Sequence, residues 1–71
     1  MTKKEKSTMN LMVWKIARRY LRAEKKGASE EKLDGMFAVM STIEYMLGID
    51  INMVMAEIEK GKTYEEIFGD E

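Results

Sequence analysis

Apolar positions in the first third of the chain recur with the period of an α-helix. Their three- and four-residue spacing places the side chains on one helical face: Met9, Met12, Val13, Ile16, Ala17, Tyr20 and Leu21. Ser7 or Thr8 offers an N-cap for this helix, and Gly27 supplies the glycine typical of a helix C-terminus. The pattern therefore predicts a first helix from about residue 8 to residue 26.

A second apolar face follows after a very short turn. Ser29 is a suitable N-cap, acidic residues occupy the first turn, and Gly48 marks the end of the pattern. The face consists of Leu33, Met36, Phe37, Met40, Ile43 and Leu47. Because the link between the two helices is so short, we expect them to form an antiparallel helical hairpin.

Two shorter helices complete the predicted architecture. Asp50 is the expected N-cap of a third helix that runs to about Lys60, with an apolar face made of Ile51, Val54, Met55 and Ile58. Thr63, followed three residues later by Glu66, forms a capping box that opens a short C-terminal helical turn. The predicted fold is all-α, a small three-helix domain built from the hairpin, the third helix and this last turn.

Both ends of the chain are polar and offer little to bury. We expect residues 1–7 to be a disordered tail, residues 8–68 to form a single helical domain, and residues 69–71 to be a second tail. The longest uncharged run, residues 35–43, has nine residues, far short of the roughly 20 that a membrane-spanning helix needs. No membrane is expected as a partner, and the sequence favours a cytoplasmic protein.

The composition argues against most catalytic chemistry. The 71 residues include no Cys and no His, which removes disulfides, thiol nucleophiles, imidazole bases and the usual zinc ligands. No phosphate-binding glycine loop or nucleophile motif is present either. We therefore expect no enzyme activity, no cofactor and no metal site. A chain this short is near the limit of independent stability, which favours a homo-oligomer or a protein partner.

Charge is divided sharply along the chain. Residues 1–26 carry nine Lys or Arg and two Glu, whereas residues 27–71 carry three Lys and eleven acidic residues. Helical spacing gathers the cations of the first helix on the side opposite its apolar face. Four of them are candidate nucleic-acid contacts, because cations along one stripe neutralise phosphates: Lys15, Arg18, Arg19 and Arg22.

Apolar residues exceed what three short helices readily bury. The chain has eight Met, which give an adaptable surface, and several apolar side chains lie off the narrow helical seams: Leu11, Trp14, Val39 and Met46. Exposed apolar patches usually bind partners, so Leu11, Trp14 and Met46 are the predicted protein interface. Trp14 is the expected anchor, since Trp is enriched at binding hot spots.

These observations favour a small non-enzymatic protein-interaction module or regulator. It would act as a homodimer, or bound to a protein partner, through the first helix. The alternative is a nucleic-acid-binding accessory protein that uses the cations of that helix.

One carboxylate breaks the apolar pattern of the second helix. Glu44 falls in the middle of the apolar face, where an unpaired charge would be costly. We expect it to pair with Lys15, Arg19 or Arg22 across the hairpin or with a second subunit, or to reach water at the edge of the face.

Overall fold

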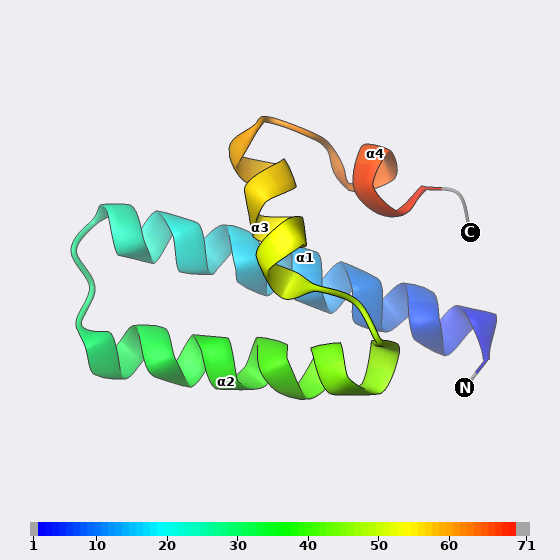
Figure 1. Cartoon of the computed structure of the whole chain (residues 1–71), viewed down its shortest axis with the longest axis horizontal. Coiled ribbons are helices and arrows are strands. Elements are labelled where there is room, and N and C mark those ends of the chain that lie inside the picture. Colours follow the sequence, from blue (N-terminus) through cyan, green and yellow to red (C-terminus); the bar gives the residue numbers. More distant parts are fainter. Residues whose placement is uncertain (1, 70–71) are drawn as a thin grey trace.

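Four helices make up the computed structural model, which describes residues 2–69 (Figure 1). Their bounds are α1 Lys3–Lys25, α2 Glu30–Leu47, α3 Ile51–Glu59 and α4 Tyr64–Phe68. Within residues 2–69 there is no β-strand. The all-α prediction is therefore confirmed, as is the order of a hairpin, a third helix and a short last helix.

The predicted caps after α1 are confirmed as well. The Ser29 hydroxyl accepts a hydrogen bond from the backbone N–H of Lys32 at the start of α2. Gly48 ends α2 with a φ of 71°, a left-handed conformation that glycine adopts without strain. Thr63 and Glu66 form the expected capping box at α4. Short polar motifs thus set the boundaries of α2, α3 and α4.

The start of α1 differs from the prediction. The helix begins at Lys3, because Thr2 and Glu5 form a capping box: the Thr2 N–H donates to Glu5 Oε1 at 2.8 Å, and the Glu5 N–H donates to Thr2 Oγ1 at 3.1 Å. Hydrogen bonds from Thr2 also hold the pKa of the Glu5 carboxyl below its usual value. A disordered tail over residues 1–7 is therefore wrong for residues 3–7, which are helical.

The predicted tail at the other end is described only at its first residue. Gly69 caps α4, and its N–H donates to the Glu65 carbonyl at 2.8 Å. Residue 1 and residues 70–71 lie outside the described residues.

The helices pack around one small core. Helices α1 and α2 run antiparallel, and α3 packs over this hairpin in contact with both (Figure 1). The core draws residues from each of these helices: Val13, Ala17, Met40, Ile43, Ile51, Val54 and Met55. Burial of apolar area is the main force that holds the three helices together. Helix α4 is peripheral and contacts α1.

Glu44 links α2 directly to α3. Its Oε2 accepts a hydrogen bond from the backbone N–H of Ile51 at 2.9 Å, and the Asp50 carboxylate accepts from the next two backbone N–H groups of α3. The predicted pairing of Glu44 with Lys15, Arg19 or Arg22 across the hairpin is therefore wrong, whereas the side chain does stay partly exposed. The partner is a helix N-terminus, whose N–H groups lack intrahelical acceptors and favour a negative charge. The axes of α2 and α3 turn by 115° at this junction, which brings Ile51 to the carboxylate.

This bond makes a direct prediction for stability. The substitution Glu44→Ala should lower the free energy of unfolding by about 1–2 kcal/mol, because a capping N–H loses its acceptor. Glu44→Gln keeps an oxygen acceptor and should cost less than Glu44→Ala. Urea denaturation followed by circular dichroism measures both. Tyr45→Ala is the control, since Tyr45 is 91% exposed on the same helix and its loss should change stability by no more than about 0.5 kcal/mol. Equal effects of all three substitutions would contradict the capping role.

Candidate interaction surface

One face of the α1–α2 hairpin is left uncovered by the other two helices. Three large apolar residues there are about half exposed: Met12 at 46%, Val39 at 47% and Met46 at 56%. Ile16 and Met36 line a shallow hollow between α1 and α2 together with Val39. Met12 lies one helical turn before Ile16, and Met46 lies two turns after Val39, so helical spacing places both on the same side.

These five residues form one apolar strip, which we call the open face: Met12, Ile16, Met36, Val39 and Met46. Both helices of the hairpin contribute to it. Its position is a consequence of the packing of α3, which fills the groove on the other side of the hairpin and leaves this one without a partner helix.

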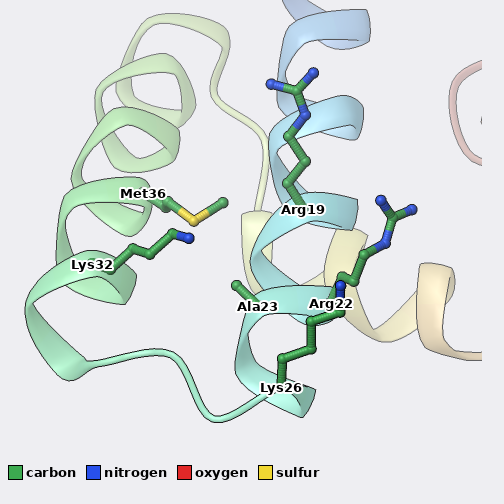
Figure 2. A pocket seen from close by; sticks show the side chains of 6 residues that line it. All are labelled: Arg19, Arg22, Ala23, Lys26, Lys32 and Met36. Carbon is green, nitrogen blue, oxygen red and sulfur yellow. The ribbon is translucent and has the colours of Figure 1, made fainter.

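Cations gather where the open face meets the hairpin turn. A second hollow adjoins the first and shares Arg19, Lys32 and Met36 with it, and Ala23 lines it from α1 (Figure 2). Its other lining residues are all cationic and come from both helices, and we call them the basic end: Arg19, Arg22, Lys26 and Lys32. In Figure 2 the side chains of Lys32 and Met36 extend from α2 toward α1. An apolar floor is thus bordered at this end by four cationic side chains, of which Arg22 extends away from α2 and also lines a hollow on the α3 side of α1 (Figure 2).

Among residues 2–69, no ion pair neutralises these four charges. The ion pairs found among residues 2–69 join Glu57 to Lys60 at 3.7 Å and to Lys62 at 2.5 Å. No residue of the basic end takes part in an ion pair within that described part of the chain. Two acids line hollows beside these cations without forming an ion pair among residues 2–69: Glu31 lies near Arg19 and Lys32, and Glu59 lies near Arg22. The basic end therefore keeps a positive field directed at solvent.

The structure separates the four cations predicted to contact nucleic acid. Arg19 and Arg22 belong to the basic end, and the Lys15 side chain is exposed to solvent. Arg18 turns to the other side of α1, where its guanidinium lies 4.7 Å from the centre of the Trp14 ring. This placement lets the guanidinium stack on the aromatic face.

Trp14, the predicted interface anchor, is half-buried inside the fold. Its ring packs edge-on against Tyr64 of α4, with centroids 5.8 Å apart and an interplanar angle of 79°. The Tyr64 hydroxyl in turn lies 3.5 Å from the carbonyl of Ser7, to which it donates. The indole N–H of Trp14 is buried and has no acceptor within residues 2–69. Helix α4 thus covers much of the Trp14 side chain.

The three predicted interface residues do not form one surface. Leu11 lies one turn before Trp14 and is 38% exposed. Trp14 and Ile16 are two residues apart, about 200° around the helix, so Trp14 faces α4 while Ile16 faces α2 and the open face. Met46 lies on the open face. An interface role for all three residues stays a prediction, but only Met46 shares the surface described above.

Sequence reasoning missed Met12, Lys26 and Lys32 as parts of this surface. Met12 shares its helical stripe with core residues, and its exposure follows from which side α3 covers. Lys32 lies among acidic residues at the start of α2, in the part of the chain that is acidic overall, so the sequence did not indicate that it belongs to a basic surface. Only the three-dimensional pairing of the two helices brings Lys26 and Lys32 together. Val39 was detectable, because it lies off the apolar seam of α2.

The paired acid Glu57 serves a structural purpose at the junction of α3 and α4. A hydrogen bond from Lys62 lowers the pKa of the Glu57 carboxyl below its usual 4.5, and the same contact raises the pKa of Lys62. The pair fixes the turn that leads from α3 into α4.

No protein family model, curated protein or solved structure matches this chain in sequence or structure comparisons. Within residues 2–69, no three acidic side chains gather in a way that would hold a metal ion. No single helix of this part of the chain is long and apolar enough to cross a membrane; α2 and α3 taken together reach that length and composition, with the 115° bend between them.

The Glu57 contact predicts a specific pH dependence. A lowered pKa in the folded state stabilises the fold above about pH 4.5, and this contribution disappears as pH falls through the folded-state pKa. The difference in unfolding free energy between the wild type and Glu57→Gln should therefore be larger at about pH 7 than at about pH 3. Urea denaturation followed by Trp14 fluorescence measures it. Glu59→Gln, which removes an acid without an ion pair among residues 2–69, should show no such change. An equal difference at both pH values would show that the pair contributes nothing.

Proposed function

We propose that this chain is a small non-enzymatic protein-interaction module, a regulator or adaptor that binds its partner through the open face. The observation that carries the proposal is the one-sided covering of the hairpin. Helices α3 and α4 both contact α1 away from the open face, which leaves Met12, Val39 and Met46 about half exposed in one strip. An aligned apolar strip of this kind is typical of a protein-binding surface.

The chemistry of the strip supports the same proposal. Met side chains are flexible and polarisable, so they adapt to the shape of an apolar partner, and three of the five residues of the open face are Met. A groove between two helices is also the kind of surface that receives an amphipathic helix. We assign this function to the cytoplasm as part of the proposal, because a chain without Cys suits a reducing compartment.

Nucleic-acid binding remains the second candidate, and the unpaired charges of the basic end favour it. Three features weigh against it. The cations border an apolar floor, which phosphates do not need, and Arg18 is turned toward Trp14 rather than toward Arg19. The chain as a whole also carries a net charge of −1, whereas nucleic-acid-binding domains are usually basic overall.

Site-specific cross-linking in the native cell tests the interaction proposal. A photoreactive amino acid placed at Met46 or Val39 should form cross-links to a protein, because both positions face the groove. The matched control is Met53, which is exposed to a similar extent, 49%, but lies on α3 and points away from the hairpin. A partner identified in this way is then purified with the full chain, and methyl NMR of the Met residues should show shifts at Met12, Met36 and Met46 and not at Met53. Absence of position-specific cross-links, or shifts concentrated at Met53, would refute the proposal.

A further inference from the structure

We infer that the occupant of the open face is an amphipathic helix of a partner protein, with acidic residues at the end that lies on the basic end. This inference rests on the proposed function and adds the shape, the charge and the orientation of the partner segment. It is argued from three features of the hairpin.

The first feature is the way α3 fills the opposite side of the hairpin. A nine-residue helix is enough to do so, and it buries Ile51, Val54 and Met55 while the outward Met53 stays exposed. The spacing of the buried residues, three and four apart, is that of one helical face. The open face is bordered by the same two helices, so its geometry suits a second helix with the same apolar spacing. Helix α3 thus shows that this hairpin binds a short helix through one apolar face, with α3 at 115° to α2.

The second feature is the continuity of apolar floor and charge. The two hollows along the open face share Arg19, Lys32 and Met36, and the one nearer the hairpin turn is lined by all four cations of the basic end (Figure 2). A helix seated along the floor would bring one of its ends to these cations. Acidic residues at that end would gain attraction without needing to be buried, and they would fix which way the helix lies in the groove.

The third feature is that a second copy of this chain would not place net negative charge against the basic end. At the far end of α1, Lys4 and Glu5 line a hollow together, and the Glu5 carboxylate already accepts a hydrogen bond from Thr2. A two-fold dimer through the open face would set the basic end of one copy either against this end or against the other basic end. Neither arrangement supplies net negative charge, so a different protein complements the face better than a second copy does.

The distribution of cations also favours a helix over a lipid surface. A helix lying on an anionic membrane carries cations along its polar face to reach headgroups over its length. Here the four cations that line the groove lie toward the hairpin turn, together with Glu31, and the strip beyond them is apolar. This arrangement favours a partner helix that carries its acidic residues at one end.

Designed peptides test the inference on the full chain. The probe is a fluorescein-labelled helical peptide of about 18 residues, or five turns, with Leu at positions three and four apart and four Glu at one end. Two control peptides replace the four Glu by Lys, or the Leu residues by Ser. Fluorescence anisotropy should show that the acidic peptide binds at least about tenfold more tightly than either control at low salt, with the difference between the Glu and Lys peptides shrinking as salt rises.

Charge reversal in the protein provides the decisive comparison. The double substitution Lys26→Glu/Lys32→Glu leaves two Arg and two Glu at the basic end, so the preference for the Glu peptide over the Lys peptide should be lost. The control Lys3→Glu/Lys25→Glu has the same change in net charge; Lys25 is adjacent to Lys26 but lines a hollow on the α3 side of α1, and the preference for the Glu peptide should remain. Circular dichroism verifies that both variants are folded.

The same measurements also test whether a lipid surface, DNA or a second copy of this chain occupies the open face instead. Anisotropy and sedimentation are repeated with vesicles containing anionic phospholipid, with duplex DNA and with the chain alone. The inference is overturned if Lys26→Glu/Lys32→Glu abolishes binding to vesicles or DNA while the Glu peptide fails to bind, if the chain forms a dimer that Val39→Asp dissociates, or if both double variants change peptide preference equally. A partner that cross-links at Val39 and Met46 but binds without salt dependence would overturn this inference alone and leave the proposed function standing.

Discussion

The junction between α2 and α3 determines the shape of the molecule. A carboxylate from the last turns of α2 binds the first N–H of α3, and Asp50 binds the next two, so that both helices are tied together at a bend of 115°. This bend places α3 on one side of the hairpin rather than in line with α2. The buried residues of α3 then complete the core on that side only. The opposite side of the hairpin therefore has no helix packed on it, and its methionines stay exposed.

The circumference of α1 is divided among three neighbours and solvent. Ile16 and the adjacent turns face α2, Val13 and Ala17 lie in the core that α3 completes, and Trp14 is covered by α4. The sector that remains carries Met12, further cations and the part of the basic end that α1 contributes. The apolar residues of α1 that lie off its narrow seam therefore serve a different neighbour from those on the seam, as Trp14 does against α4.

Local chemistry explains why much of the fold could be predicted. Ser29, Gly48, Asp50 and Thr63 act on backbone groups within a few residues, so their effect can be inferred without knowing the tertiary structure. The start of α1 was missed because a run of Lys and Glu has no apolar face and resembles a tail, although such residues favour helix once a capping box is present. The lesson is that polar segments need the same search for caps as apolar ones.

The candidate surface was less predictable, because it depends on which side of a helix is covered. Met12 and Val13 are neighbours in sequence, but Met12 is 46% exposed and Val13 is fully buried. Glu44 looked like a partner for cations across the hairpin, but its acceptor atoms are used seven residues further along the chain. Trp14 was the predicted interface anchor, but its ring packs against Tyr64 within the same chain. This contact could not be predicted from the sequence, because Tyr64 lies fifty residues away and no periodicity connects the two residues. These outcomes were decided by tertiary geometry.

The contact between Tyr64 and Ser7 spans 57 residues and joins the last helix to the first turns of α1. Contacts within the hairpin close short loops, whereas this one closes nearly the whole chain, and the entropy of loop closure grows with the length of the loop. Folding should therefore proceed from the hairpin to α3 and end with α4, as expected where local contacts form before distant ones. The indole of Trp14 becomes shielded only at that final step, so that the single tryptophan of this chain reports when the fold is closed.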